Sequence, residues 1–322
     1  MKRKPDIGWV KDVVAVAVFL FLFPYFAISF KQQKEDLLKD ETKDTELQIC
    51  YEQISELPHN ENYFVVWEDD GTRLKLPIEN FLIGALAASI PVTYEEEVLR
   101  AQVILLRSTV CGLFEEAEAD MRGVKTITLK DGEGNFWTDR HMQSAWGENY
   151  DENLKKCTIA VLDTQGIYLA YAGKPVEGYY HGMSAGRTRD GKELSEEELL
   201  NYLKVAECTE NLSDQSFVTE MEVKKEETGK LEEDQRTEDG YVISVKRDGR
   251  QISGELLREE LGLASSNFSW REENNSYIFS VKGFGHGFGL DQYYGNILAA
   301  EGKEYKEIIN YFFADVTFQK ME

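Results

Sequence analysis

The stretch GFGHGFGLDQYYGN, at residues 283–296, places one histidine, His286, among evenly spaced glycines. The glycines alternate with other residues, at Gly283, Gly285, Gly287 and Gly289. Because glycine tolerates positive φ and close backbone approach, this spacing predicts a tight, bare loop that presents His286. Asp291 and Gln292 add hydrogen-bonding groups directly after the loop. Such a loop suits an extended polymer lying against backbone and imidazole, although a glycine-rich turn with a hydrogen-bonded structural histidine fits the same letters.

Short strands are predicted on both sides of this loop in the sequence. Residues 277–282, just before it, form an alternating segment of the kind found in strands. Near the start of the folded part, β-prone runs at residues 63–67 and 72–76 flank Asp-Asp-Gly at 69–71, which predicts a hairpin. Further strands are predicted at residues 124–129, 166–171, 176–181, 217–223 and 241–245.

A long apolar helix is predicted between these strands. Residues 94–118 are apolar on nearly every face, which is typical of a buried helix, and Thr93 with Glu96 predicts a capping box at its start. Arg107 lies within this helix and therefore needs a partner for its charge. Shorter helices are predicted at residues 78–88, 151–163, 195–202 and, after a Ser253 cap, 254–261. The expected fold class is α+β: a mixed domain with a buried central helix and short β-strands, preceded by one transmembrane helix.

The amino-terminal part has the pattern of an uncleaved signal anchor. Residues 13–30 are almost entirely apolar and are long enough to span a bilayer as a helix. Basic residues precede this span, acidic residues follow it, and no small-residue cleavage site comes after it, so residues 1–12 are predicted to be cytoplasmic. Residues 31–62 are then a stalk and residues 63–322 an extracytoplasmic domain, in which the charged segment 209–240 is predicted to be a solvated connector.

The charge of the chain restricts its partners. A formal net charge of −23 disfavours nucleic acid or another polyanion as the main partner, whereas a neutral or mixed-charge polymer suits it better. The four cysteines are widely spaced and form no C-x-x-C cluster, which argues against a structural zinc site. In an oxidising compartment they can form disulfides, but the sequence leaves the pairing open. They are Cys50, Cys111, Cys157 and Cys208.

Four separated segments share a pattern with one known family. They are TYEEEVLRAQVILLRST at residues 93–109, DTQGIYLAYAGKPVEGYYHGMSAGRT at 163–188, ISGELLREELGLASSNF at 252–268, and the glycine loop with EGKEYKEIINYFF at 301–313. In this order they resemble the stage II sporulation protein D and amidase-enhancer family, from about residue 72 to the end. The resemblance implies a membrane-tethered lytic transglycosylase that cuts denuded peptidoglycan glycan strands during engulfment of the forespore. It also implies a sporulation amidase and other engulfment proteins as partners.

One position departs from the pattern of that family. The implied reaction needs a carboxylic acid that protonates the leaving oxygen and then accepts a hydroxyl proton. The family carries it as a glutamate in an A-x-E-M-P-like turn before the central helix, whereas residues 87–91 here read Ala-Ala-Ser-Ile-Pro, with Ser89 at that position. A serine hydroxyl is no general acid near neutral pH without a base to tune it, so we expect a protein that binds glycan without cutting it. Glu95, Glu96 or Glu97 is the alternative source of a carboxyl group.

The same resemblance marks candidate glycan contacts. His181 and His286 lie in the two best-matching motifs and are expected to line the cleft, and a hydrogen-bonded structural role fits each of them equally. Arg187 and Thr188 can bind sugar hydroxyls or fix their loop. The full set of candidate substrate contacts is His181, Ser184, Arg187, Thr188, His286, Asp291 and Gln292.

The resemblance also implies a zinc site in some family members, formed by a histidine and cysteines near the motif that contains His181. The nearest downstream cysteine here is Cys208, and no second cysteine lies beside it. Because a metal site needs three or four convergent ligands, neither a metal nor another cofactor is predicted.

A serine hydrolase is the rival from a different class of enzyme. Residues 182–186 fit G-x-S-x-G, with Ser184 as the nucleophile and His286 downstream as the triad order requires. That motif needs a strand, a sharp turn and then a helix, whereas turn-forming residues follow Ser184 here. No oxyanion segment of the HGGG type lies upstream, so we rank this reading below glycan binding.

The membrane topology is directly testable. We expect the full-length chain to stay in the membrane, and protease added outside to remove the folded domain, because basic residues precede the apolar span and no cleavage site follows it. Immunoblotting of protease-treated protoplasts measures this. Protection of the domain, or its release with a new N-terminus near residue 31, would show that the anchor prediction is wrong.

Overall fold

The computed structural model describes residues 62–69, 72–130, 135–194, 198–213 and 217–321. The predicted cytoplasmic segment, the predicted membrane span at residues 13–30 and Cys50 lie outside the described residues, as does nearly all of the predicted stalk. None of the helices in the described ranges is both long and apolar enough to cross a membrane. The chain divides by its internal contacts into Met1–Glu56 and Leu57–Glu322, and the second unit holds all elements described below.

The first sheet begins with the predicted hairpin. Strand β1 (Tyr63–Asp69) pairs antiparallel with β2 (Thr72–Pro77), with Asp69 opposite Thr72, so the hairpin is confirmed. Strand β3 (Lys125–Lys130) joins the other side of β1 in parallel. Helix α3 (Ile78–Ser89) follows β2 directly and packs against β1 and β2.

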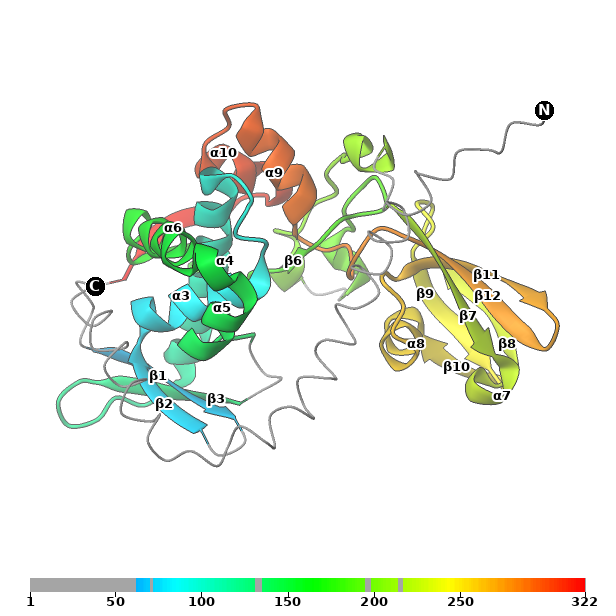
Figure 1. The fold of residues 1–322 in the computed structure, drawn as a ribbon, viewed down its shortest axis with the longest axis horizontal. Coiled ribbons are helices and arrows are strands. Elements are labelled where there is room, and N and C mark those ends of the chain that lie inside the picture. Colours follow the sequence, from blue (N-terminus) through cyan, green and yellow to red (C-terminus); the bar gives the residue numbers. More distant parts are fainter. Residues whose placement is uncertain (1–61, 70–71, 131–134, 195–197, 214–216, 322) are drawn as a thin grey trace, which may run out of the picture. The chain divides into compact units, whose positions relative to one another are not determined.

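Helix α4 (Glu96–Glu116) is the buried central helix that the sequence predicts. Every residue from 98 to 105 except Arg100 is buried. Figure 1 shows α9 and α10 beside α4, although they come from the end of the chain. The helices packed against α4 are α3, α6 (Tyr150–Asp163), α9 (Gln292–Ala300) and α10 (Tyr305–Phe312).

The start of α4 differs from the predicted capping box. Pro91 and Tyr94 form a turn, in which the Tyr94 amide donates to the Pro91 carbonyl (3.0 Å), so the helix begins only at Glu96. Glu95 is the N-cap, and its amide donates to Oδ1 of Asn296 (2.7 Å) instead of to a nearby side chain. The capping box of Thr93 with Glu96 is therefore wrong.

Two further elements near the middle of the chain differ from the prediction. The predicted strand at 176–181 is reduced to β6 (Tyr180–His181), because Gly178 packs tightly on α4: a Cβ there would lie 2.3 Å from the carbonyl oxygen of Leu105. The helix predicted at 195–202 is a single 3₁₀ turn, Glu198–Leu200, in its described part. The sequence also gave no signal for α5 (Asp139–Trp146), a short polar helix that begins at a Thr138 cap.

Short strands complete the helical region of this unit. Strand β4 (Ile167–Tyr171) lies between β14 (Thr317–Lys320) and β5 (Lys174–Pro175). Strand β6 pairs in parallel with β13 (Leu290–Asp291), which places His181 opposite Asp291. This short pairing brings the two histidine-bearing motifs together.

The charged segment 209–240 is not a connector. It supplies β7 (Val218–Lys224), α7 (Lys225–Thr228) and β8 (Leu231–Arg236), and the burial of β7 alternates as Phe217, Thr219, Met221 and Val223 predict. Charged side chains lie on the outer faces of these strands, while Val223 and Leu231 join a buried apolar cluster. A charge-rich segment can therefore form sheet when every second residue faces inward.

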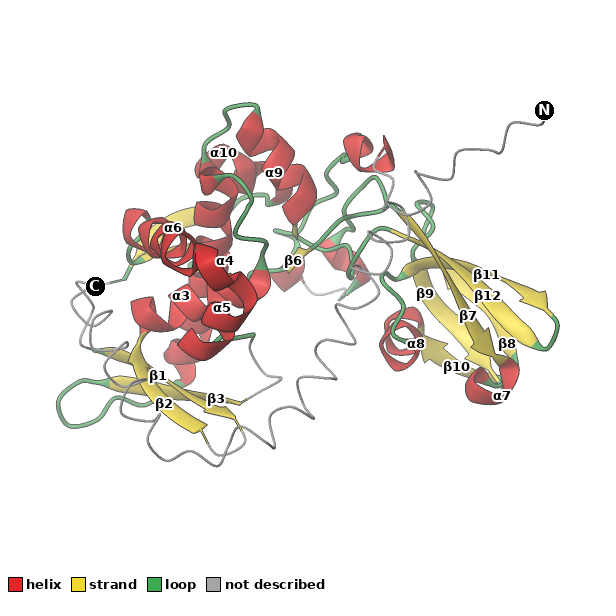
Figure 2. Cartoon of the chain, in the orientation of Figure 1, coloured by secondary structure: helices red, strands yellow, loops and turns green. Residues whose placement is uncertain are grey.

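Two three-stranded sheets enclose that cluster (Figure 2). One has the order β11-β12-β7, with β11 (Asn267–Glu273) and β12 (Ser276–Lys282), and the other has the order β10-β9-β8, with β9 (Val242–Arg247) and β10 (Arg250–Ser253). Helix α8 (Gly254–Leu261) packs against β9. Its predicted cap is confirmed, because the Ser253 side chain accepts from the Leu256 amide (3.1 Å). The described part of the chain is thus α+β, as expected.

Arg107 on α4 has the buried partner that its position requires. It is 0% exposed and binds Glu79 of α3 through two hydrogen bonds, of 3.1 Å from Nε and 2.6 Å from Nη2. The carbonyl of Ile167 accepts a further bond from Nη1 (2.9 Å), and Glu79 also accepts the Gly166 amide (3.1 Å). The predicted pairing is confirmed, and this ion pair joins α3, α4 and the start of β4.

Removing one member of this pair should destabilise the protein strongly. We expect Glu79→Gln to lower the free energy of unfolding by about 3–5 kcal/mol, because the Arg107 charge would stay buried without its counterion. The double variant Glu79→Leu/Arg107→Met removes both charges. Its free energy of unfolding should therefore fall much less than the sum of the decreases caused by Glu79→Leu and Arg107→Met separately. Urea unfolding followed by circular dichroism measures these differences.

The surface pair of Arg271 with Glu220 is a matched control. Their side chains lie 2.9 Å apart but are 56% and 60% exposed. Glu220→Gln should change the free energy of unfolding by no more than about 0.5 kcal/mol. A Glu79→Gln variant as stable as this control would contradict the assigned role of the buried pair.

Candidate functional site

The glycine loop is packed tightly against the segment HGMSAG at residues 181–186. All four of its glycines have positive φ, as the spacing predicts. A Cβ at Gly289 would lie 2.1 Å from the carbonyl oxygen of Tyr179, and one at Gly285 would lie 2.8 Å from the Cβ of His181. The bare backbone therefore lets two distant segments of the chain touch directly.

Asp291 is the polar centre of this contact. It is fully buried, and its Oδ2 accepts three hydrogen bonds, from the amide and hydroxyl of Ser184 (2.8 and 2.6 Å) and from Nδ2 of Asn211 (2.6 Å). Its Oδ1 caps α9 by accepting from the Tyr294 amide (2.9 Å). Hydrogen bonds from several donors stabilise a buried carboxylate, so Asp291 ties the segments of Ser184 and Asn211 to the start of α9.

His181 lies next to this carboxylate and is 4% exposed. Its Nδ1 is 3.0 Å from the carbonyl oxygen of Phe288, so Nδ1 is the ring nitrogen that donates. Its Nε2 is buried without a hydrogen-bond partner, 4.0 Å from Oδ2 of Asp291. Burial lowers the pKa of His181, while the nearby Asp291 carboxylate opposes that shift.

His286 is partly exposed and neutral. Its Nδ1 accepts from the Phe288 amide (3.0 Å), and its ring also hydrogen-bonds to the backbone of Tyr180. Burial, together with His181 nearby, lowers the pKa of His286 to about 3. The two imidazole rings lie 5.7 Å apart, so the two motifs form one site.

Ser89 lies at the end of α3, beside the same two motifs. Its side chain is partly buried, and its hydroxyl accepts a hydrogen bond from Oη of Tyr180 (3.1 Å), the residue before His181. Its carbonyl accepts from Nε2 of Gln292 (2.8 Å), which also donates to Oε1 of Gln102 on α4 (3.1 Å). The turn that carries Ser89 is therefore bonded to both motif segments.

Arg187 and Thr188 hold their own loop. The Arg187 guanidinium is partly exposed and pairs with Glu207 (3.0 Å) and Asp239 (3.1 Å). Thr188 is buried, donates to the Lys204 carbonyl (3.0 Å) and accepts the Ala206 amide (2.8 Å). Arg187 and Thr188 were predicted either to bind sugar hydroxyls or to fix their loop, and these bonds show that they fix the loop.

Burial divides the predicted substrate contacts into two groups. His286 and Arg187 keep part of their side chains accessible. The others are buried, and direct contact between them and a bound polymer stays a prediction: His181, Ser184, Thr188, Asp291 and Gln292.

Ser184 is not placed as the nucleophile of a hydrolase. Its hydroxyl is fully buried and donates to Asp291 rather than to a histidine. Residues 185–190 after it form no helix, so the helix that the hydrolase motif requires after the turn is not present there. The hydrolase reading is wrong on both counts.

Several residues that complete the site had no recognisable signal in the sequence. Tyr241, directly before β9 and distant in the sequence, donates to the Arg187 carbonyl (3.2 Å) and accepts the Ala185 amide (2.8 Å). The Arg189 guanidinium stacks over Phe288, 4.3 Å from the ring centroid. Asn211 contacts Asp291 from within a charged stretch where nothing singled it out. Tyr180 could have been proposed from the sequence, because it directly precedes His181.

The described cysteines are free thiols, and they do not form a metal site. Cys111, Cys157 and Cys208 are unpaired and buried. Burial raises the pKa of the Cys208 thiol, which lies beside Ser184 and Asp291. Among the described residues no group of three or more His, Cys, Asp or Glu side chains could hold a metal ion.

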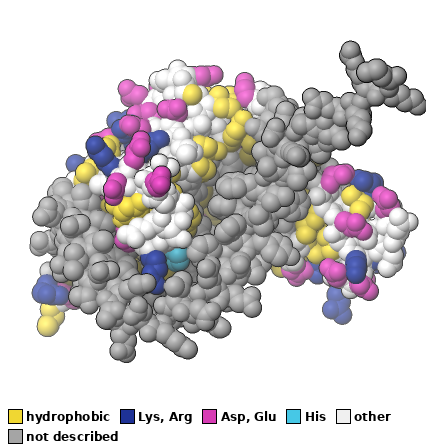
Figure 3. Space-filling model, in the orientation of Figure 1, with side chains coloured by type: hydrophobic (Ala, Val, Ile, Leu, Met, Phe, Trp, Pro, Cys, Tyr) yellow, Lys and Arg dark blue, Asp and Glu magenta, His cyan; other side chains and the backbone are white. Residues whose placement is uncertain are grey.

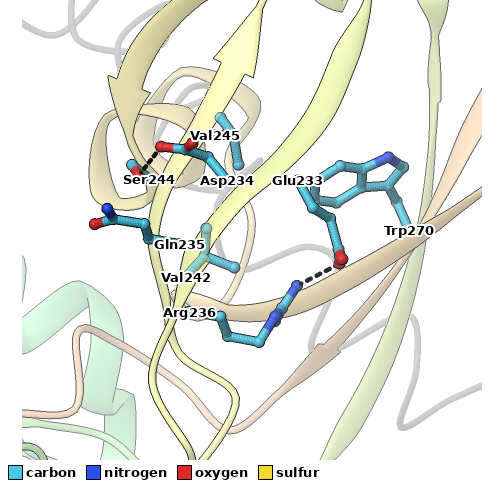
Figure 4. A pocket seen from close by; sticks show the side chains of 8 residues that line it. All are labelled: Glu233, Asp234, Gln235, Arg236, Val242, Ser244, Val245 and Trp270. Carbon is cyan, nitrogen blue, oxygen red and sulfur yellow. Dashed lines mark hydrogen bonds and ion pairs between the residues drawn. The ribbon is translucent and has the colours of Figure 1, made fainter.

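A small cavity lies elsewhere, between β8, β9 and β11 (Figure 4). Its volume is about 50 Å³, well below the roughly 300 Å³ at which small-molecule sites begin. Its polar groups already have partners, since Asp234 binds Ser244 (2.6 Å) and Arg236 binds Glu233 (3.0 Å). The lining residues are Glu233, Asp234, Gln235, Arg236, Val242, Ser244, Val245 and Trp270, none of which belongs to the predicted site.

Acidic and basic side chains are interspersed on the face shown in Figure 3. The described residues on this face form no continuous basic surface.

Comparison with known proteins adds relatives that carry a name. A family model for stage II sporulation protein, SpoIID, matches residues 71–171, which include α3, Ser89 and α4. Stage II sporulation protein D of Bacillus amyloliquefaciens is 28% identical over 263 residues, covering 77% of this chain and 75% of that protein. The protein of the same name from Bacillus subtilis (strain 168) is 28% identical over 252 residues, covering 74% and 73%.

A shorter match reaches a protein without an assigned role. An uncharacterized protein of Brachyspira hyodysenteriae (strain ATCC 49526 / WA1) is 31% identical over 80 residues, which cover 24% of this chain and 22% of that one. The two Bacillus matches, by contrast, extend well beyond the region of the family model. The chain thus carries a SpoIID domain at residues 71–171 and is similar over about three quarters of its length to stage II sporulation protein D.

Proposed function

We propose that this protein binds peptidoglycan glycan strands during sporulation and does not cut them. The family supplies the substrate class, and the contact between Ser89 and the two motifs supports its site. The observation that carries the proposal is the pair of hydrogen bonds from Tyr180 and Gln292 to Ser89. These bonds keep the turn of the expected catalytic residue next to His181 and His286, in a chain where that residue has no carboxyl group.

The chemistry of Ser89 explains why cleavage is lost. Glycosidic cleavage needs a group that gives a proton to the leaving oxygen and takes one from the attacking hydroxyl. The hydroxyl of Ser89 instead accepts from Tyr180 and donates to the carbonyl of Ala85, the residue one helical turn earlier. A hydroxyl that is held in this way positions the turn and supplies no acid.

The nearby glutamates are poorly placed to replace the missing acid. Glu96 and Glu97 both form ion pairs with Arg100 (2.9 and 2.6 Å), and Glu97 also accepts the Tyr305 amide (2.8 Å). Glu95 is exposed at the N-cap of α4 and is the alternative to test if cleavage is found.

The proposed setting is the outer face of a membrane. The apolar residues 13–30 would anchor the chain as a single-pass protein, with the N-terminus in the cytoplasm and the folded unit outside. A sporulation amidase that strips the peptides from glycan strands would supply the substrate, and it and other engulfment proteins are the partners that the family suggests. Neither nucleic acid nor a cofactor enters this proposal.

Restoring the carboxyl group tests the proposal. Full-length protein in detergent should co-sediment with peptide-free glycan strands and release no anhydro-ended fragments. Ser89→Glu should release such fragments above the wild-type background, with a gain of up to about 10²–10⁴-fold, because it adds the general acid that the reaction lacks. Mass spectrometry of the soluble products measures this.

Ser89→Gln is the matched control, since it adds the same volume and hydrogen-bonding reach without an acid. It should bind glycan and produce no fragments. Fragments from the wild-type protein would contradict the loss of cleavage, and Glu95→Gln would then test the alternative acid. Absence of glycan binding by the wild-type protein would contradict the proposed function itself.

Glycan binding should be insensitive to pH between about 5 and 8. Burial lowers the pKa of His286 to about 3, so this ring stays neutral in this range, and burial lowers the pKa of His181 as well. Stability, in contrast, should fall as pH drops from about 6.5 toward about 3, because the unfolded chain takes up these protons first. Affinity is therefore measured only where circular dichroism shows folded protein. An affinity that weakens as pH rises through about 6.5 would indicate a protonated histidine in the site.

A further inference from the structure

Phe284, in the middle of the glycine loop, is unusual in its exposure. Its side chain is 61% exposed, and it is the one aromatic residue of the described chain that is exposed rather than buried or partly buried. Single exposed apolar side chains are common on protein surfaces and need no explanation by themselves. The position of Phe284 in the site and its fixed backbone are what indicate a function.

The backbone of Phe284 is fixed on both sides. Its amide donates to the Met183 carbonyl (2.6 Å), and its own carbonyl accepts the Met183 amide (3.0 Å). The next amide, of Gly285, donates to the carbonyl of Ala264 (2.7 Å). The loop thus joins two other segments of the chain at this point, and the ring projects from a fixed base.

The Phe284 ring rests on a glycine of the other motif. A Cβ at Gly182 would lie 2.9 Å from Cδ1 of Phe284 and 3.4 Å from its Cβ. Gly182 directly follows His181, so the ring lies beside the residue pair that joins the two motifs. Any larger residue at position 182 would displace the Phe284 ring. With glycine there, the ring keeps this position and its other face stays exposed to solvent.

Partly exposed polar and aromatic groups belong to the same site. His286 is two residues further along the loop, and its ring contacts that of Tyr179 edge-on at 6.0 Å between centroids. Tyr180 links His181 to Ser89 through its hydroxyl. A flat apolar ring near hydroxyl and imidazole groups matches a ligand that has an apolar face and polar edges.

We infer that Phe284 is a stacking platform for one pyranose ring of the bound polymer. A pyranose ring presents C–H groups on its faces and hydroxyl groups around its rim. The electron-rich face of an aromatic ring attracts such C–H groups, and burying both faces removes apolar surface from water. This inference rests on the proposed function and adds the residue that recognises the sugar ring itself.

One sugar ring is the occupant that the surface favours. Within the part of the chain that the structure describes, Phe284 is the one exposed aromatic residue, whereas a protein partner is normally held by a cluster of buried aromatic and apolar anchors. The negative charge of the chain disfavours stacking with the bases of a nucleic acid. If Phe284 instead binds a protein partner, Phe284→Ala should leave the affinity for glycan oligosaccharides unchanged.

Substitutions at Phe284 test the inference in the full-length protein. The probe is a set of soluble, peptide-free glycan oligosaccharides made of alternating N-acetylglucosamine and N-acetylmuramic acid, titrated by isothermal calorimetry. Phe284→Leu keeps apolar volume over Gly182 but lacks a flat face, and it should weaken binding by roughly fivefold to tenfold, as Phe284→Ala should. Phe284→Tyr and Phe284→Trp should bind as well as the wild-type protein.

Leu199→Ala is the matched control, because Leu199 is 62% exposed and lies outside the two motifs. It should leave the affinity unchanged, and thermal unfolding should show all of these variants to be as stable as the wild-type protein. A stable Phe284→Leu or Phe284→Ala variant with wild-type affinity would overturn the stacking role while the proposed function stands. If Phe284→Ala is unstable, Phe284→Leu alone decides. Lack of oligosaccharide binding by the wild-type protein would overturn both proposals.

Discussion

The carboxylate of Asp291 holds the candidate site together. It is fully buried and accepts hydrogen bonds from Ser184, Asn211 and Tyr294, which come from three separate parts of the chain. A buried charge is tolerated only when such bonds replace the water that it has lost. This requirement fixes the first motif, the glycine loop and the start of α9 relative to one another, and the neighbouring His181 and His286 take their positions from it.

A second buried charge organises the helices behind the site. The ion pair of Arg107 with Glu79 joins α3 to α4, and Arg107 also binds the carbonyl of Ile167 at the start of β4. Ser89 is the last residue of α3, so its position depends on how α3 packs against α4. Buried ion pairs add little net stability, but they disfavour other packings that would leave either charge alone. The place of Ser89 beside the motifs thus follows from a contact that lies deeper in the core.

A site can keep its structure when one catalytic group is absent. The groups that fix the motifs are the Asp291 carboxylate and the bare glycine backbone, and neither depends on a carboxyl group at position 89. Tyr180 and Gln292 bond to Ser89 through groups that a serine offers without change, its hydroxyl and its backbone carbonyl. A binding surface can therefore persist after the acid has gone, which makes a protein that holds glycan without cutting it physically reasonable.

The sequence by itself determined the features that depend on neighbouring residues. The apolar pattern of α4, the hairpin of β1 and β2, the Ser253 cap and the positive φ of the loop glycines all follow from local preferences, and the structure confirms them. The need of Arg107 for a partner followed from burial alone, although the sequence did not name Glu79.

Only the tertiary structure decided which distant residues meet. Nothing in the charged stretch from 209 to 240 marked Asn211 as a ligand of Asp291 or Leu231 as part of a core, because pairing across the chain sets both roles. The predicted strand at 176–181 failed for the same reason, since the close contact of Gly178 with α4 outweighed its local preference. Side-chain exposure is likewise a property of the whole fold: Phe288 and Phe284 lie in the same glycine repeat, yet packing under Arg189 buries the first and leaves the second open.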